Sequence, residues 1–333
     1  MIDPHGRLRN KSESIRCIVN PAAGAGRAGA GVSRLKRALD RTFEQWDVVL
    51  TEGQGHASVL ATEAVEEGLD IVAAVGGDGT CHEVVNGMFD GKVNRSRRTV
   101  FSVIPWGTGS DLARTLEIPT RVEDALWIAS TGMTLLADVG YATLLDRDGG
   151  DLSRCFINSA SFGASGDVVQ RVNSGSKRFG GRASFLKATL SSLVNYRPVD
   201  VSIKWGSEAN SGEWQGELLS GFVLNGGWCG GGMRLTKMTS MFDGNLDLFV
   251  LPSMPAVSSI MNSWKLFGAR IGTVKGVEQH HPEWVEVASN SGESMLLELD
   301  GEQPGTLPAK LEILPGALQV RGGWLRSPVH SLQ

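Results

Sequence analysis

The stretch AVGGDGTCHEVVNG, from Ala74 to Gly87, decides how the chain is interpreted. A run typical of a buried strand, Leu69 to Val75, precedes it, and the spacing of Thr80 and Glu83 predicts a capping box and a helix that begins at Thr80. The order is therefore strand, glycine turn and helix N-terminus. The glycines expose the backbone to an anion, and the helix start offers unpaired N–H groups with a partial positive charge. The stretch predicts a phosphate-binding turn; the alternative is a tight turn in which Asp78 is a local cap.

Asp78 is the unusual member of this turn. A carboxylate beside phosphate oxygens is repulsive unless a cation lies between them, and Mg²⁺ is commonly held by carboxylate and phosphate oxygens. The residue therefore predicts Mg²⁺ bound together with the phosphates.

The composition suits two ordinary globular domains, with 333 residues of which 41% are hydrophobic. The net charge of −4 and the lack of a Lys/Arg block indicate no nucleic-acid partner. The four cysteines form no CxxC pair, which is typical of reduced thiols in a cytoplasmic protein. No run approaches the roughly 18 apolar residues of a membrane span, so any membrane contact is expected to be peripheral.

Strands and short helices alternate in the first part of the chain. The expected strands are 15–19, 46–50, 69–75 and 99–104, and the expected helices are 32–43, 57–67, 80–89 and 112–115. This alternation predicts an open parallel sheet with helices on both faces, where ligands bind beyond the carboxyl ends of the strands. The glycine loops after the first, third and fourth strands can share one site there. The first loop also matches G-x-G-x-x-G, but Asn20-Pro21 makes it longer than a dinucleotide fingerprint requires.

The second part of the chain, from about Leu135, is β-rich and predicts an antiparallel β-sandwich interrupted by two helices, 181–196 and 256–272. The expected strands are 155–161, 199–205, 216–224, 245–251, 277–288, 294–299 and 310–314. The expected organisation is a disordered lead-in over 1–14, an α/β domain over 15–137, a β domain over 138–314, and a segment 315–333 that can return to the first domain.

Several motifs occur in one order along the chain: VNPAAG at 19–24, GGDGT at 76–80, HEVVNG at 82–87, IPWGTGSDLA at 104–113, DVG at 138–140, Asn158, DG at 243–244 and LDGE at 299–302. With them the chain resembles the diacylglycerol kinase catalytic-domain family, which includes bacterial diacylglycerol and YegS-like lipid kinases and the sphingosine and ceramide kinases. GGDGT is shared with NAD kinases, whereas GTGSDLA and LDGE are more specific for lipid kinases.

The resemblance implies an ATP-binding α/β domain and a β-sandwich lipid-substrate domain with ATP in the cleft between them. It implies ATP contacts by Asn20, Pro21, Ala22, Ala23, Gly24, Thr51, Gly76, Gly77, Asp78, Gly79, Thr80, Glu83, Thr108 and Gly109. It implies Mg²⁺ ligands or a Mg²⁺ and water network at Asp78, Asp111, Asp138, Ser240, Asp243 and Asn245. It also places a catalytic base at Asp300, with Glu302 close by.

Several of these acids have a simpler interpretation from the residues alone. Asp300 and Asp243 each precede a glycine, which is common turn chemistry. The sequence also departs from the family pattern at two places. Ser110 stands where the family usually has Asn, and Lys237-Met238, close to the expected second metal site, stands where a Pro-Asp pair is common.

The two expected helices of the β-rich part carry apolar faces with cations nearby. The first has Phe185, Leu186, Leu190, Leu193 and Val194 beside Lys177, Arg178, Arg182 and Lys187, and the second has Met261, Trp264, Phe267 and Ile271 beside Lys265 and Arg270. Such a face suits an anionic membrane surface. The alternative is a core-facing amphipathic helix.

The sequence therefore predicts an ATP- and Mg²⁺-dependent lipid kinase that phosphorylates the primary hydroxyl of diacylglycerol, a sphingoid base or ceramide, in the cytoplasm and peripherally associated with a membrane. The alternatives are a NAD-kinase-like nucleotide kinase and a non-catalytic ATP-binding module. Whether the chain forms a homodimer stays open.

Overall fold

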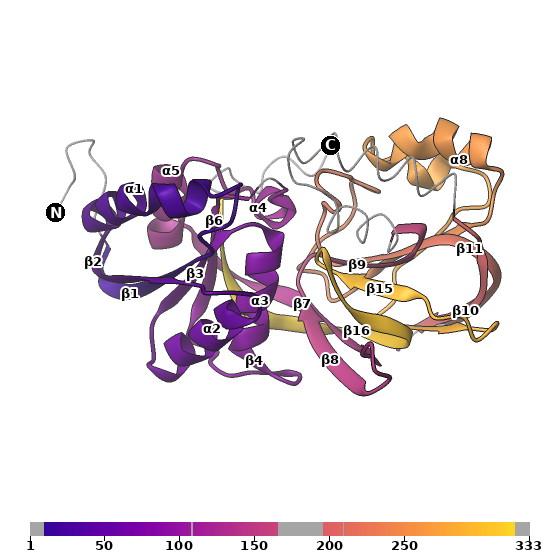
Figure 1. Cartoon of the computed structure of the whole chain (residues 1–333), viewed down its shortest axis with the longest axis horizontal. Helices are drawn as coiled ribbons and strands as arrows, with labels where there is room; N and C mark the ends of the chain where they lie inside the picture. Colours follow the sequence, from indigo (N-terminus) through magenta and orange to yellow (C-terminus); the bar gives the residue numbers. More distant parts are fainter. Residues whose placement is uncertain (1–9, 108, 166–195, 209, 324–333) are drawn as a thin grey trace. The chain divides into compact units, whose positions relative to one another are not determined.

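A computed structural model describes residues 10–107, 109–165, 196–208 and 210–323 (Figure 1). The chain divides into two compact units, Met1–Ala137 with Ala317–Gln333, and Asp138–Gly316. It passes from one unit to the other within two strands, β7 (Met133–Leu145) and β16 (Glu302–Gly322).

Four parallel strands form the sheet of the first unit in the order β2-β1-β3-β6. They are β1 (Asn10–Val19), β2 (Phe43–Leu50), β3 (Ile71–Gly76) and β6 (Val100–Pro105). Every residue of β3 and β6 is buried, as expected for parallel strands covered on both faces. The end of β16 returns to this sheet, where Val320 pairs in parallel with Phe101. A short hairpin of β4 (Phe89–Asp90) and β5 (Val93–Asn94) follows α3.

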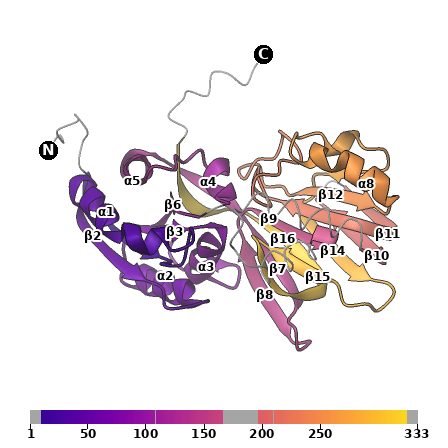
Figure 2. The same ribbon diagram turned by 45° about the horizontal axis from the view of Figure 1, so that its top comes forward.

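Helices cover both faces of this sheet. Helix α1 (Arg27–Thr42) contacts α5 (Val122–Thr131), and α2 (His56–Glu66) contacts α3 (Asp78–Met88). The two pairs lie on opposite sides of the strands in Figures 1 and 2. Helix α4 (Asp111–Thr115) follows β6. Helix α5 has no counterpart among the predicted elements.

The expected disordered lead-in is wrong for residues 10–14, because β1 begins at Asn10. Within this part Ser14 has specific partners: its backbone N–H and its hydroxyl both donate to Asp70 Oδ2, each at 2.8 Å. Asp70 in turn donates its N–H to Ser14 Oγ at 3.1 Å. These polar residues therefore extend the strand although they lack the apolar pattern of one.

The second unit is antiparallel at every registered pairing among its described strands. Besides parts of β7 and β16 it contains β8 (Asp151–Phe156), β9 (Ser159–Gly163), β10 (Val199–Gly206), β11 (Ser211–Leu224), β12 (Asp247–Pro252), β13 (Glu278–His280), β14 (Trp284–Ser289) and β15 (Leu296–Leu299). Two runs expected as single strands, 155–161 and 277–288, are each divided in the structure. Pro282, which has no N–H for a ladder, lies in the second break.

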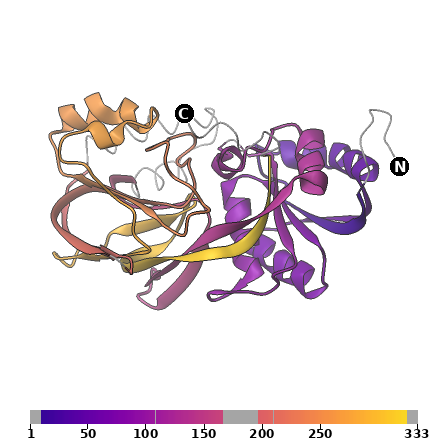
Figure 3. The ribbon, with the colours of Figure 1, turned by 180° about the vertical axis from the view of Figure 1, so that it is seen from behind.

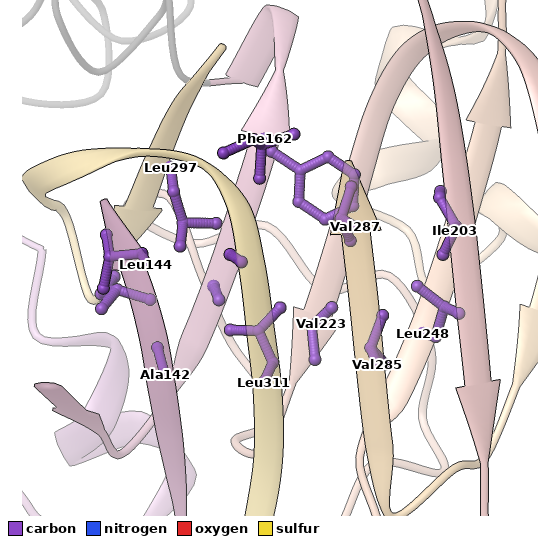
Figure 4. Packing of buried hydrophobic residues seen from close by; sticks show 14 of the residues in the cluster. Ala142, Leu144, Phe162, Ile203, Val223, Leu248, Val285, Val287, Leu297 and Leu311 are labelled. Carbon is purple, nitrogen blue, oxygen red and sulfur yellow. The ribbon is translucent and has the colours of Figure 1, made fainter. Parts of the chain in front are cut away.

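Side chains from most strands of the second unit fill one apolar core (Figure 4). In β11 and β12 the side chains alternate with the period of a strand: Val223 and Leu248 point into this core, whereas Phe222 and Phe249 join a second buried cluster. This part of the sheet is therefore buried on both faces.

A helical segment after β12 covers the second of these faces. It consists of α8 (Ala256–Asn262) and the 3₁₀ turns η1 (Ser263–Leu266) and η2 (Ile271–Thr273), so the single helix expected over 256–272 is wrong. The helical structure is interrupted between η1 and η2, where Gly268 lies and where Ala269 has a left-handed φ of 54°. The other expected helix, 181–196, lies outside the described residues apart from Tyr196. Among the described residues, none of the helices combines the length and the hydropathy that a membrane-spanning helix needs.

Candidate functional site

The loops that follow β1, β3 and β6 lie at one edge of the first unit's sheet, because these adjacent strands are parallel. Backbone hydrogen bonds join the loops to one another. Asn20 N–H donates to Val75 O at 3.1 Å, and the N–H groups of Trp106 and Gly107 both donate to Gly76 O at 2.8 Å. Backbone hydrogen bonds therefore hold together the three glycine loops that the sequence analysis identified.

Glycine is required in these loops because their backbones touch. A Cβ atom on Gly107 would lie 2.4 Å from Gly77 Cα, and one on Gly24 would lie 2.4 Å from Trp106 O. A Cβ atom on Gly76 would lie 2.3 Å from Thr80 Oγ1. Part of the glycine pattern thus has a packing cause, in addition to any ligand that the loops bind.

The start of helix α3 differs from the prediction. The helix begins at Asp78, after an extended Gly77 with φ −106°, and has no side-chain cap among the described residues. The predicted capping box is wrong because both of its side chains have other partners: Thr80 Oγ1 accepts from Asn20 Nδ2 at 3.4 Å, and Glu83 Oε2 accepts from Ala57 N–H at 3.1 Å. The N-terminal turn of α3 thereby keeps the uncapped start that anion binding uses.

Asp78 connects the starts of α3 and α4. Its Oδ1 accepts a hydrogen bond from Leu112 N–H at 3.0 Å, so two of the predicted metal ligands, Asp78 and Asp111, belong to neighbouring helix starts. Asp111 is buried and forms an ion pair with Arg114. Among the described residues no group of three or more His, Cys, Asp or Glu side chains is close enough to hold a metal ion.

The other predicted nucleotide contacts of the first unit follow the same strand ends. Asn20 Oδ1 accepts from Ala22 N–H at 3.0 Å and so shapes the turn that contains Pro21, Ala23 and Gly24. Thr51, which follows β2, is buried and donates its N–H to Val19 O at 2.9 Å. Gly79 lies in the first turn of α3, Gly109 precedes α4, and Thr108 lies outside the described residues.

In the second unit the carboxylate of Asp300 holds a turn of backbone. The residue occupies the turn between β15 and β16, has a φ of 51° and is 6% exposed. Its Oδ2 accepts from Ile157 N–H at 2.9 Å, and its Oδ1 accepts from Asn158 N–H at 2.8 Å and Ser159 N–H at 3.0 Å. These bonds use three of the roughly four lone-pair positions of a carboxylate. They also explain why the expected strand 155–161 is divided there.

The surrounding acids differ in their environment. Glu298 is buried and accepts from Ser161 Oγ at 2.5 Å and from Gly301 N–H, so it fixes the turn that carries Asp300. Glu302, the expected companion of Asp300, is half-buried at the start of β16. The sequence pointed to Glu302 and missed Glu298, which alternates with apolar neighbours in a strand of LLEL and could have been noticed as a buried acid.

Asp138 performs a similar task at the limits of the second unit. It is 3% exposed, its Oδ2 accepts from Gly244 N–H at 2.8 Å, and its Oδ1 accepts from Gly316 N–H at 2.7 Å. Because Asp138 and Gly316 are the first and last residues of this unit, the carboxylate joins the two chain crossings.

Asn225 links Asp138 to the backbone that Asp300 holds. Its Nδ2 donates to Asp138 O at 2.9 Å and to Ile157 O at 2.7 Å, and its N–H donates to Asn158 O at 3.0 Å. The fully buried side chain leaves Oδ1 without a hydrogen-bond partner in the described part of the chain. The sequence analysis missed this residue, although a polar side chain between the apolar end of β11 and Gly226-Gly227 was a usable signal.

The predicted second metal site lies on the loop before β12. Burial, together with the carboxylates of Asp247 and Asp138, raises the pKa of the Asp243 carboxyl, although the hydrogen bond from Asn245 N–H and the nearby His281 oppose the shift. The structure places Asp243 and Asn245 in direct contact through a 3.0 Å bond from Asn245 N–H to Asp243 Oδ1.

Comparison with known proteins agrees with this architecture. Residues 14–142 match the model of the diacylglycerol kinase catalytic domain, and residues 158–322 match that of the YegS C-terminal NAD kinase beta sandwich-like domain. A diacylglycerol kinase of Bacillus subtilis is 29% identical over 301 residues, with 89% of this chain and 91% of the relative covered. A probable lipid kinase, YegS-like, of Stenotrophomonas maltophilia is 25% identical, with 83% and 86% covered.

A solved structure supports the fold. The crystal structure of a Bacillus anthracis diacylglycerol kinase has a TM-score of 0.68 and 20% identity, covering 93% of this chain and 97% of that one. The solved structure supports a two-domain fold with a C-terminal β domain, and the matched family models and curated relatives identify the chain as a kinase. The chain belongs to the diacylglycerol kinase catalytic-domain family, together with the YegS-like lipid kinases.

Proposed function

We propose that this protein is an ATP- and Mg²⁺-dependent kinase that phosphorylates the primary hydroxyl of diacylglycerol or of a related lipid, a sphingoid base or ceramide. The observation that carries the proposal is the group of three joined glycine loops at one sheet edge, in a chain whose two parts match the lipid-kinase family models. Phosphoryl transfer chiefly requires the phosphates to be positioned and their charge to be neutralised.

In the first unit the loops would bind the phosphates of ATP through backbone N–H groups, with the uncapped start of α3 as the strongest donor. Mg²⁺, when bound, supplies neutralisation of the phosphate charge. Asp78 and Asp111 are the carboxylates that would hold it there, and hard oxygen donors of this kind fit Mg²⁺. The bond from Leu112 N–H and the ion pair with Arg114 orient these two carboxylates.

In the second unit Asp300 is the proposed acceptor of the hydroxyl proton. The lipid hydroxyl oxygen forms a bond to the γ-phosphorus, its proton passes to Asp300, and the bond from the γ-phosphorus to the bridging oxygen breaks to release ADP. The three backbone donors from residues 157–159 fix the direction of this carboxylate, as a general base requires.

A second Mg²⁺ would have a structural role near Asp243. Burial, followed by the nearby carboxylates of Asp247 and Asp138, raises the pKa of Asp243. The buried Thr239 Oγ1, nearby in the sequence, has no hydrogen-bond partner among the described residues. Both observations fit an oxygen-liganded cation. Ser240, Asp243 and Asn245 are the residues that would hold it, with Asp138 in the surrounding network.

The test is transfer of label from γ-labelled ATP to a panel of extracted lipids, with NAD as a further acceptor. Label in diacylglycerol, a sphingoid base or ceramide supports the proposal and identifies the lipid class. Label in NADP would show a nucleotide kinase instead, and ATP binding without transfer to any acceptor would show a non-catalytic module. Asp78→Asn should abolish transfer, whereas Asp90→Asn, at a carboxylate 79% exposed in the same unit, should leave it unchanged.

A further inference from the structure

The segment after β12 presents an unusually apolar surface to solvent. Its outward side chains are Val257 and Met261, each 69% exposed, Trp264 at 55%, Phe267 at 41% and Ile260 at 39%. These five residues, called the α8 surface below, are five of the twelve large exposed apolar side chains among the described residues. They all fall within α8, η1 and the residue that follows η1. Such clustering is typical of an interaction surface, since single exposed apolar residues are ordinary.

The α8 surface is not the core-facing side of the segment. A separate set of side chains, which includes Leu266, Ile271 and Val274, is buried against Phe222 and Phe249 on the outer face of β11 and β12. The segment lies on the outside of the β unit in Figures 2 and 3. The inner side chains already anchor the segment, so the folding of the unit does not account for the outer apolar residues.

The charged residues within the segment itself, from residue 248 to 277, all have one sign. The chain has no Asp or Glu between residues 248 and 277, whereas this stretch carries Lys265, Arg270 and Lys275. Arg270 and Lys275 are exposed, and Lys265 is half-buried within η1. A local surplus of three cations on a chain with a net charge of −4 marks a partner that is negatively charged as well as apolar.

We infer that the α8 surface inserts into an anionic lipid bilayer. Tryptophan, phenylalanine and aliphatic side chains enter the boundary between headgroups and acyl chains, and the flanking lysine and arginine side chains contact anionic headgroups. The choice of a bilayer over a protein partner rests on the proposed function, because the substrate of a lipid kinase resides in a membrane. The surface itself is defined by exposure and charge alone.

The experiment measures binding of the full chain to sedimented vesicles of phosphatidylcholine mixed with the anionic lipid phosphatidylglycerol, compared with vesicles of phosphatidylcholine alone. Trp264→Ser with Phe267→Ser should weaken binding by about tenfold or more, because each side chain loses the apolar area that it buries in the bilayer. The matched control is Val93→Ser, which removes an apolar side chain 68% exposed on β5 and should leave binding unchanged. Thermal melting of each variant checks that it remains folded.

The charges are tested separately. Arg270→Gln with Lys275→Gln should lower the affinity for anionic vesicles by about thirtyfold, because each of the two cations contributes roughly 1 kcal/mol. The double variant should also lose most of the salt dependence of binding. Binding to pure phosphatidylcholine should be weak for every variant. Equal binding of wild type and the Trp264→Ser, Phe267→Ser variant would overturn the inference. Analytical ultracentrifugation without vesicles tests the alternative that a second copy of the chain covers the α8 surface. A wild-type dimer that becomes a monomer in the Trp264→Ser, Phe267→Ser variant would also overturn the inference.

A soluble acceptor separates this inference from the proposed function. With monomeric short-chain diacylglycerol, the Trp264→Ser, Phe267→Ser variant should keep wild-type kcat and KM while it loses activity on vesicles. Vesicle binding without transfer to either acceptor would leave the surface in place and contradict the lipid-kinase proposal. Transfer of phosphate to the soluble acceptor, without binding of the wild type to vesicles, would support the lipid-kinase proposal and contradict membrane insertion of the α8 surface.

Discussion

The glycine loops of the first unit and the acidic turns of the second are stabilised in opposite ways. In the loops, backbone carbonyls accept from backbone N–H groups, and glycines permit approaches such as that of Gly107 to Gly77. In the turns, the buried carboxylates of Asp138 and Asp300 accept from backbone N–H groups of distant segments. The first arrangement is held by the backbone itself, whereas the second uses half or more of the acceptor capacity of its acids to hold backbone turns.

This difference matters for any mutational test of the mechanism. A loss of activity on removing Asp300 can arise from lost proton transfer or from a loosened β unit, because the same oxygens would serve both purposes. Substitutions of the loops carry the opposite risk, since added side-chain atoms disturb the packing before they disturb a ligand. Each experiment below therefore includes a measurement of stability.

The largest effect is expected for Asp300→Ala. Three buried N–H groups, of Ile157, Asn158 and Ser159, would lose their acceptor, and each such loss costs about 1–3 kcal/mol. We expect the free energy of unfolding of the β unit to fall by about 3 kcal/mol or more, measured by urea denaturation. Asp148→Ala, at an exposed turn acid of the same unit, is the control and should change little. Wild-type stability in Asp300→Ala would show that the turn does not need its carboxylate.

A smaller effect is expected for Gly107→Ala in the first unit. The new methyl group would lie 2.4 Å from Gly77 Cα, and overpacking of this kind typically costs about 1–3 kcal/mol. Urea denaturation measures this loss of stability. The affinity for ATP should fall as well, because the loops after β3 and β6 would be forced apart. Gly53→Ala is a matched control, since its Cβ would meet nothing within 4 Å. If the two variants bound ATP equally well, the contact between the loops would be irrelevant to the site.

The next effect concerns pH and Mg²⁺ at Asp243. Because the pKa of this carboxyl is raised in the folded state, its stabilising contribution is present below its ordinary pKa and is lost as pH rises through the raised value. A cation bound to the ionised carboxylate would offset this loss. Mg²⁺ at tenfold excess over Kd should stabilise the protein near pH 7 by about 1.4 kcal/mol, measured as a rise in Tm. Asp243→Asn should remove this rise, whereas Asp148→Asn should retain it. An undiminished response in Asp243→Asn would place the cation elsewhere.

The smallest effect is expected at Ser110, where the family usually has Asn. This residue has a left-handed φ of 54° at the start of α4, a conformation that Asn adopts more readily than Ser. Ser110→Asn should raise the free energy of unfolding by about 0.5 kcal/mol, measured by thermal melting. A loss of stability would mean that the hydroxyl of Ser110 stabilises the folded state by more than the left-handed backbone conformation destabilises it.

The sequence predicted what depends on local pattern. The alternation of strands, glycine turns and helices in the first unit is visible over short windows, and the apolar run Leu69 to Val75 corresponds closely to β3. The start of α3 could not be predicted from its own residues. Glu83 matches a capping box, but it accepts from Ala57 N–H, and this helix-to-helix contact competes with the local one.

The rest depends on partners that lie far away in the sequence. Asp300-Gly301 predicts a turn, but the backbone N–H groups of residues 157–159, which donate to the Asp300 carboxylate, are more than 140 positions away. Strand β7 was not predicted because Asp138 and Gly140 interrupt its pattern. Gly140 is required there by the ring of Phe156, which a Cβ would approach to 2.1 Å. The α8 surface illustrates the same limit, since the sequence alone could not distinguish its outward side chains from those that face the core.

The most direct test of the comparison measures ATP binding and phosphoryl transfer in Asp300→Asn under conditions in which the variant is shown by melting to be folded. Asparagine keeps the shape of the side chain and an acceptor for the turn but is not a base. The account predicts wild-type affinity for ATP with Mg²⁺, since the nucleotide is bound by the loops of the first unit, and no transfer of the γ-phosphate to any lipid. Transfer at the wild-type rate would contradict it.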